Sequence, residues 1–214
     1  MTLELFASHE PRRQPLAPGA AILRGFATTR ADALLDAVDA LVRHSPFRHL
    51  VTPGGHRMSV AMTNCGAWGW TSDTSGYRYR DEDPETGRPW PAMPPVFAAL
   101  ARDAAAELGF DDYAPDACLV NRYVPGSKLS MHQDLDEADA VAPIVSVSLG
   151  IGATFLWGGA RRSDRAVAFD LSHGDVVVWG GASRHRFHGV RPIAEASHAR
   201  TGRVRINLTF RRAR

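Results

Sequence analysis

The segment His132-Gln133-Asp134 places an imidazole and a carboxylate two residues apart. The stretch around it, 128–134, alternates like a β-strand, on which side chains two positions apart share one face. An imidazole beside a carboxylate supplies two of the three ligands of a 2-His-1-carboxylate iron(II) site. His-x-Asp is common by chance, so this interpretation depends on a third ligand and a co-substrate site elsewhere in the chain.

A second His-x-Asp segment, His173-Gly174-Asp175, lies between two apolar runs at 166–171 and 176–179. Its central glycine is typical of a hairpin turn. We therefore interpret this segment as structural.

The third ligand should be a histidine far along the chain. His185, His188 and His198 all follow the apolar run that ends at Trp179. His198 lies in a polar loop and is expected to be exposed. His188 begins the return into the last strand, which favours it over His185, although spacing alone leaves both open.

The last predicted strand, 203–211, carries two opposite faces. One face holds Arg205, Asn207, Thr209 and Arg211, and the other holds Val204, Ile206, Leu208 and Phe210. A solvated edge strand shows the same alternation. However, two arginines with no acid between them suit a doubly anionic ligand, because guanidinium–carboxylate pairs are strong and directional.

Asn121 and Tyr123 share a face of the predicted strand 118–124, which enters the His132 segment. They could donate hydrogen bonds to the same anionic ligand. Ordinary cross-strand hydrogen bonding is the alternative for both residues.

The remaining patterns predict two helices followed by a run of strands. An extended lead-in (1–20) and a strand (21–26) precede a helix that starts at Thr29 with Asp32 in a capping box and ends at Ser45-Pro46. A strand (58–63), a loop-rich stretch (64–95) and a second helix (96–108) follow. Strands are then predicted at 118–124, 128–134, 144–149, 153–157, 166–171, 176–179 and 203–211. This order favours a mainly β fold with flanking helices (α+β), the helices covering one face of a jelly roll.

Composition sets bounds on the class of protein. The chain of 214 residues fits one domain, and 44% hydrophobic residues are ample for a core. A net charge of +2 gives no support for general polyanion binding. Lys128 is the only lysine among 25 basic residues, which leaves 24 arginines, an excess that a compositional bias largely explains.

The two cysteines, Cys65 and Cys118, lack metal-binding or redox spacing and read as buried thiols in a reducing compartment. Residues 1–13 show no secretory signal pattern, and no apolar run approaches the ~20 residues of a membrane span. We therefore expect a cytoplasmic protein with no membrane contact and no obligate protein partner.

Taken together, these motifs resemble the AlkB family of iron(II)/2-oxoglutarate dioxygenases. The resemblance rests on His132-x-Asp134, the distal His188-Gly189, Arg205-x-Asn207-x-Thr209-Phe210-Arg211, Asn121-Arg122-Tyr123 with Pro125-Gly126, and the upstream Met62-Thr63-Asn64-Cys65-Gly66. It covers nearly the whole chain and is loosest in the first 45 residues and at 194–203.

The resemblance implies a single domain, 1–214, with a double-stranded β-helix (jelly roll, cupin-like) core at about 117–214 and a nucleotide-recognition lid at about 46–95. It implies that catalytic Fe(II) is held by His132, Asp134 and His188. The co-substrate 2-oxoglutarate would be bound by Asn121, Tyr123, Arg205, Asn207 and Arg211, with O2 as the second co-substrate.

The activity implied is oxidative demethylation of 1-methyladenine and 3-methylcytosine in alkylated single-stranded DNA, with RNA and double-stranded DNA as further candidates. Such a base must be unpaired or flipped out to reach a buried metal. The expected substrate-binding residues are Trp70, Tyr77, Arg78, Tyr79, Asp136 and Arg162. The aromatic rings would stack on the base, Asp136 would face its cationic ring, and Arg162 would contact a phosphate or position the strand.

Structural roles remain alternatives for these substrate residues, and other activities remain alternatives for the function. The aromatic residues could pin down a long loop, and Asp136 could be a solvated turn acid beside Glu137 and Asp139. An oxygenase acting on a protein or small metabolite, or a non-catalytic cupin-like metal-binding module, would share the metal motif. A zinc hydrolase would leave Arg205 and Arg211 without a role.

Overall fold

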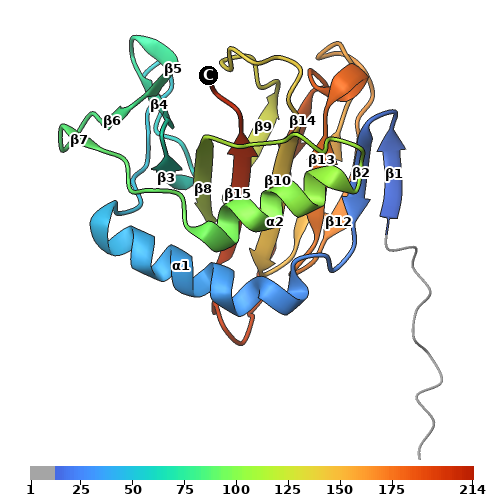
Figure 1. Ribbon diagram of the computed structural model, residues 1–214, viewed down its shortest axis with the longest axis horizontal. Helices are drawn as coiled ribbons and strands as arrows, with labels where there is room; N and C mark the ends of the chain where they lie inside the picture. Colours follow the sequence, from blue (N-terminus) through green and yellow to red (C-terminus); the bar gives the residue numbers. More distant parts are fainter. Residues whose placement is uncertain (1–12) are drawn as a thin grey trace, which may run out of the picture.

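A computed structural model describes residues 13–214, whose core is two antiparallel sheets packed face to face (Figure 1). The large sheet has the order β1 (Arg13–Ala17), β2 (Ala20–Leu23), β13 (Val176–Trp179), β10 (Ile144–Gly150), β15 (Arg205–Arg211), β8 (Ala117–Tyr123) and β3 (Ala61–Gly66). The small sheet has the order β12 (Val167–Leu171), β11 (Ala153–Trp157), β14 (His188–Val190) and β9 (Leu129–His132). This is the predicted jelly-roll architecture, mainly β with flanking helices.

Two helices, α1 (Ala31–His44) and α2 (Pro95–Ala106), cross the outer face of the large sheet (Figure 1). Their apolar faces share one core with the sheet, in which the rings of Phe97 and Phe210 meet edge to face at 5.9 Å. Both helices were predicted, and both are confirmed. The capping box at Thr29 is wrong, because a short 3-10 turn (Thr28–Arg30) precedes α1 and no side chain caps that end.

The alternation along β15 is confirmed, and it is not that of a solvated edge. The strand lies between β10 and β8, and all seven of its residues are buried. Ile206, Leu208 and Phe210 pack beneath the helices. The polar set that begins at Arg205 faces the space between the two sheets, because successive side chains on a strand alternate in direction.

Three local predictions need correction. Within the described part of the lead-in, 13–20, the chain forms β1, while residues 1–12 lie outside the described residues. The stretch 64–95 contains the hairpin β4 (Gly69–Asp73) and β5 (Gly76–Arg80) and the short pair β6 (Glu82–Asp83) and β7 (Arg88–Pro89). Strand β9 ends at His132, so Asp134 lies beyond it and strand parity does not place its carboxylate.

The segment His173–Asp175 is structural, as predicted, but it does not join paired strands. It connects β12 in the small sheet to β13 in the large sheet. Gly174 has a φ of +87°, which favours glycine, and the Asp175 carboxylate accepts hydrogen bonds from Gly25 N and from Arg24.

The two cysteines are buried and free, as expected, and they face each other across β3 and β8. Among residues 13–214, no helix is long and apolar enough to cross a membrane.

Candidate metal centre and co-substrate cavity

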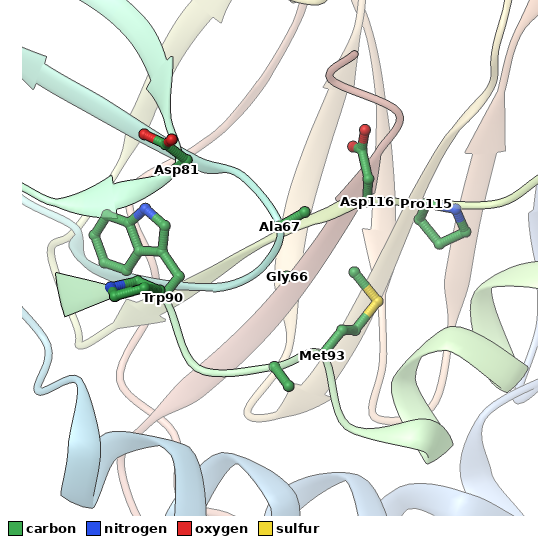
Figure 2. A pocket seen from close by; sticks show the side chains of 9 residues that line it. Gly66, Ala67, Asp81, Trp90, Met93, Pro115 and Asp116 are labelled. Carbon is green, nitrogen blue, oxygen red and sulfur yellow. The ribbon is translucent and has the colours of Figure 1, made fainter.

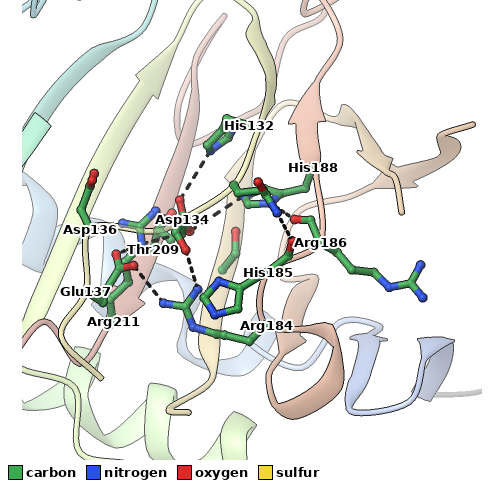
Figure 3. Close-up of polar contacts among 12 residues, drawn as sticks. His132, Asp134, Asp136, Glu137, Arg184, His185, Arg186, His188, Thr209 and Arg211 are labelled. Atoms are coloured by element: carbon green, nitrogen blue, oxygen red, sulfur yellow. Dashed lines mark hydrogen bonds and ion pairs between the residues drawn. The ribbon is translucent and has the colours of Figure 1, made fainter. Parts of the chain in front are cut away.

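The predicted metal ligands meet between the two sheets. Strands β9 and β14 pair so that His132 lies opposite His188, with ring centroids 4.3 Å apart. The Asp134 carboxylate completes the group: its oxygens lie 3.6 Å from His132 Nε2 and 3.9 Å from His188 Nε2 (Figure 3). One ligand atom from each residue lies within 4.8 Å of the others, which suits a single metal ion.

Hydrogen bonds to the main chain fix the tautomer of both histidines. His132 Nδ1 lies 2.9 Å from Ser130 O, and His188 Nδ1 lies 3.1 Å from Arg186 O. Because a carbonyl can only accept, each Nδ1 carries the proton and each Nε2 keeps a free lone pair toward the cluster. The stacked pair His173 and His198 differs, since each Nδ1 accepts a main-chain N–H and each neutral ring is therefore protonated at Nε2.

The electrostatics of the cluster also fit a divalent cation. Burial lowers the pKa of His188 to about 3, so its imidazole is neutral at physiological pH. Burial alone would raise the pKa of Asp134, but Arg211 and the two histidines outweigh it and hold that pKa well below its usual range. Two imidazoles and one carboxylate are the donor set of a non-haem iron(II) site.

The structure brings His188, and not His185, to this cluster. His188 is buried beside Trp179, with ring centroids 4.8 Å apart. His185 does not line the cavity, and its carbonyl accepts a short hydrogen bond from Gln133 Nε2. The basic segment that contains His185 therefore supplies main-chain contacts to this site.

A cavity of about 720 Å³ surrounds the group formed by His132, Asp134 and His188 and extends from there, between the sheets, to an open rim. Of the predicted site residues, it is lined by His132, Asp134, His188, Asn121, Tyr123, Arg205, Asn207, Arg211, Trp70, Tyr77, Asp136 and Arg162. These residues come from six strands and two loops that are distant in the sequence, and they line one space.

Arg205 is a buried cation with no acidic partner among residues 13–214. Its side chain stacks on the Tyr123 ring, with Cζ 4.9 Å from the ring centroid, and donates one hydrogen bond to Ser148 Oγ. Within the described chain, its Nε and Nη1 find no hydrogen-bond partner, and burial lowers its pKa. An isolated buried charge is costly, so this guanidinium fits a ligand carboxylate.

Arg211 is placed differently, although it lines the same cavity. Its Nε and Nη2 donate to Asp134 Oδ2 at 3.1 and 3.0 Å, and its Nε lies 3.3 Å from Glu137 Oε1. These two acids counteract burial and raise its pKa. Arg211 therefore orients the carboxylate of a predicted metal ligand. Its predicted contact with 2-oxoglutarate stays a prediction.

Asn207 and Asn121 form a short amide network beside Arg205. Asn207 Nδ2 donates to Ser146 Oγ and to Val147 O, and its Oδ1 accepts from Asn121 Nδ2 and from Thr209. In the described residues, Asn121 Oδ1 has no partner. The network fixes the amide side chains that line the wall of the cavity.

Four of the predicted substrate-binding residues lie at the rim. Trp70 Nε1 donates to Asp136 Oδ2 at 2.8 Å, and the Trp70 and Tyr77 rings stack with centroids 5.4 Å apart. Arg162 stacks on Phe187 and donates to Met131 O. The rim thus presents aromatic faces beside a carboxylate and a guanidinium.

The other two predicted substrate-binding residues do not line this cavity. Tyr79 is buried against Ala117 and Ala213, and its hydroxyl donates to Glu137. Arg78 pairs with Asp73 across the β4–β5 hairpin. Strand alternation turns Arg78 away from the face that Trp70 and Tyr77 share, so Arg78 does not reach the cavity.

Sequence reasoning missed the residues behind Asp134. Arg184 and Glu137 are almost fully buried and form an ion pair of 3.0 Å (Figure 3). In the sequence, Glu137 simply follows Asp136, and Arg184 stands in the basic segment Arg184-His185-Arg186. No local signal reveals the pair, because 47 residues separate its two members.

A second cavity, of about 470 Å³, is lined by Gly66, Ala67, Asp81, Pro89, Trp90, Ala92, Met93, Pro115 and Asp116 (Figure 2). None of the predicted site residues lines it. Asp116 accepts hydrogen bonds from Ala213 N and Arg214 N, and Trp90 Nε1 donates to Arg80 O. These contacts hold the last residues of the chain and the β5 end in place.

Comparison with known proteins agrees with the fold and the donor set. The family model described as the 2OG-Fe(II) oxygenase superfamily matches residues 19–211. The fold and the site thus define an Fe(II)/2-oxoglutarate-dependent dioxygenase.

The chain is 56% identical over 211 residues to the alpha-ketoglutarate-dependent dioxygenase AlkB of Salmonella typhimurium and 54% identical over 211 residues to that of Escherichia coli. Each alignment covers 99% of this chain and 98% of the relative. The solved structure of OsALKBH1 has a TM-score of 0.79 and 32% identity, covering 92% of this chain and 100% of its own. The chain belongs to the AlkB family, which uses Fe(II), 2-oxoglutarate and O2.

Replacing His188 by Ala should abolish succinate formation and weaken iron(II) binding by at least about tenfold. Losing a residue that only contacts a metal ligand already lowers metal affinity about tenfold, and His188 is predicted to be a ligand itself. His185→Ala is the matched control and should bind iron like the wild type. Anaerobic titration with iron(II) measures both. The reverse outcome, with His185 essential and His188 dispensable, would contradict the ligand set.

Replacing Arg205 by Ala should lower 2-oxoglutarate affinity about ten- to a hundredfold, since a charge-assisted pair contributes roughly 1.5–3 kcal/mol. Arg205→Lys should recover only part of the loss, because an ammonium cannot reproduce the planar fork. Calorimetry on the cobalt-loaded protein measures the affinity. Arg203→Ala, at an exposed position paired with Glu195, is the control. Unchanged affinity in the Arg205→Ala variant would remove the assignment.

Proposed function

We propose that this dioxygenase removes methyl groups from ring nitrogens of nucleic acid bases, with 1-methyladenine and 3-methylcytosine in single-stranded DNA as its substrates. The observation that carries the proposal is the hydrogen bond of 2.8 Å from Trp70 Nε1 to Asp136 Oδ2 at the rim of the metal cavity. It holds an aromatic face and a carboxylate side by side.

The chemistry of these lesions explains why such a pair is useful. Methylation at N1 of adenine or N3 of cytosine leaves the ring cationic. A cation in a partly dry pocket is stabilised by an aromatic face and by a nearby carboxylate. Trp70 supplies the face, Asp136 supplies the charge, and the Asp136 carboxylate also accepts a hydrogen bond from the exocyclic amine.

The depth of the metal cluster supports an unpaired base as substrate. Asp134 and His188 are buried between the sheets, whereas Tyr77 and Asp136 are exposed at the rim. A base within a duplex cannot enter such a cavity unless it leaves the stack, which costs a few kcal/mol. Single strands avoid that cost. In this proposal, the β4–β5 hairpin belongs to a nucleotide-recognition lid (46–95) over a core (117–214) in one domain.

The residues around the cluster each have a defined task. Bound iron(II) would supply the redox chemistry by which O2 oxidises 2-oxoglutarate to succinate and carbon dioxide and hydroxylates the methyl group, with one oxygen atom going to each. Arg205 anchors a carboxylate of the co-substrate. Phe155 and Trp179 pack on His188 and exclude water from that side. The hydroxymethyl base then loses formaldehyde, which restores the unmodified base.

The proposal is tested by formaldehyde release from an oligonucleotide that carries one 1-methyladenine or 3-methylcytosine. The assay contains iron(II), 2-oxoglutarate and ascorbate, and the unmethylated oligonucleotide is the control. We expect formaldehyde and succinate in equal amounts, faster from the single strand than from its duplex. Methylated strands that release no formaldehyde and leave succinate formation unchanged would favour a protein or metabolite substrate.

Replacing Asp136 by Asn keeps an acceptor for Trp70 Nε1 and removes the charge. We expect kcat/KM on 1-methyladenine to fall about tenfold or more, since a hydrogen bond to a charged group contributes about 1.5–3 kcal/mol. The uncharged lesions 1-methylguanine and 3-methylthymine should be affected little, and iron binding should be unchanged. Asp139→Asn, a nearby acid outside the cavity, is the control. An equal fall on both lesion classes would contradict the charge-based role.

A further inference from the structure

Behind the predicted metal ligands lies a buried network of two arginines and two acids. Arg211 donates to Asp134 Oδ2, and Arg184 Nη1 donates to Asp134 O at 3.1 Å (Figure 3). Glu137 contacts both arginines, through Oε1 to Arg211 Nε at 3.3 Å and through Oε2 to Arg184 Nη2 at 3.0 Å. All four side chains are at least nine-tenths buried.

The charges of this network balance only when Glu137 is ionised. Two guanidinium groups then face two carboxylates, and each arginine has an acid of its own. Without the charge of Glu137, Arg211 would keep Asp134 as its ion-pair partner. Arg184, which contacts only the main-chain oxygen of Asp134, would have no carboxylate partner among the described residues. Breaking a buried ion pair by removing one member leaves an uncompensated charge, which is strongly destabilising.

The Asp134 carboxylate cannot satisfy unpaired guanidinium groups and a metal equally well. A carboxylate offers about four lone-pair directions, and Arg211 already takes two hydrogen bonds on Oδ2. Any further pull by the arginines would turn the carboxylate away from the histidines and lower its electron density. Glu137 limits that pull, because it holds Arg211 Nε and Arg184 Nη2 on its own oxygens.

We infer that Glu137 is a positioning residue for the iron ligand Asp134 and acts through Arg211 and Arg184. This inference rests on the proposed metal centre. Tyr79 extends the effect outward, because its hydroxyl donates to Glu137 Oε1 at 2.6 Å from β5 of the recognition hairpin. The Glu137 carboxylate thus links the β4–β5 hairpin, through Tyr79, to the two arginines that contact Asp134.

The test is cobalt(II) binding to the metal-free protein, followed by absorption spectroscopy, with no turnover required. Glu137→Gln keeps the shape of the side chain and removes its charge. We expect cobalt affinity to fall about ten- to a hundredfold, the usual effect of losing an outer contact to a metal ligand. The cobalt spectrum should also change, because the Asp134 carboxylate moves relative to the histidines.

The matched control is Asp83→Asn. Asp83 is another buried acid paired with an arginine, Arg48, and it does not line the metal cavity. The loss of its charge should lower the melting temperature but leave cobalt affinity within about twofold of wild type. Losing a contact to a metal ligand would instead lower that affinity about tenfold. A purely structural role for Glu137 predicts the same behaviour in both variants.

The double variant Glu137→Gln/Arg184→Gln removes one charge of each sign. We expect it to recover much of the cobalt affinity, and it stands in for the single variant if that one does not fold. Wild-type cobalt affinity in the Glu137→Gln variant would overturn the inference. So would a double variant that binds cobalt no better than the single one. If only the double variant folds, an affinity no better than about a tenth of wild type would also overturn it. Failure of the wild-type chain to bind cobalt would instead overturn the metal centre itself, and the role of Glu137 with it.

Discussion

Strand β15 must bury two guanidinium groups on one face while its other face completes the core beneath the helices. The apolar face makes the strand central and rigid, since Leu208 and Phe210 are fully buried. The polar face then carries charge into the cavity between the sheets. Each buried arginine needs an anion, and the two needs are met differently. Arg211 is satisfied by acids of the chain, whereas Arg205 finds no acid in the described residues.

That difference separates the cavity into two functions. At Asp134 the protein supplies the anion itself, and Arg211 orients the carboxylate of this predicted metal ligand. At Arg205 it supplies none among the described residues, and the unpaired guanidinium suits the carboxylate of an anionic co-substrate. Both arise from one alternating strand, so the fold and the chemistry have a common cause.

Much of this arrangement could be predicted from the sequence, because its signals are local. Period-two alternation identified β15 and β8 and the faces that Arg205 and Asn121 occupy. The apolar periodicity of 31–44 identified α1, and both cysteines were expected to be buried. Strand parity was expected to place Asp134 beside His132, but β9 ends at His132. The guanidinium of Arg211 positions the carboxylate instead.

The features that escaped prediction depend on partners distant in the chain. Glu137 looks like a solvated acid until Arg184 is brought beside it. The β4–β5 hairpin was hidden because its glycines and polar residues are typical of loops. Tyr79 shares a face with Tyr77 by parity, yet packing against Ala117 and Ala213 buries it. Such outcomes are decided by tertiary contacts and not by local propensity.

The ladder between β14 and β9 also governs how the chain length can vary. His188 pairs with His132, and the register shifts before Val190 pairs with Leu129. One residue inserted between Arg186 and His188 would turn the histidine to the opposite face, because side chains alternate with a period of two. The exposed segment 194–202 carries no such constraint. Insertions and deletions among natural variants should therefore gather there and spare the three residues of β14.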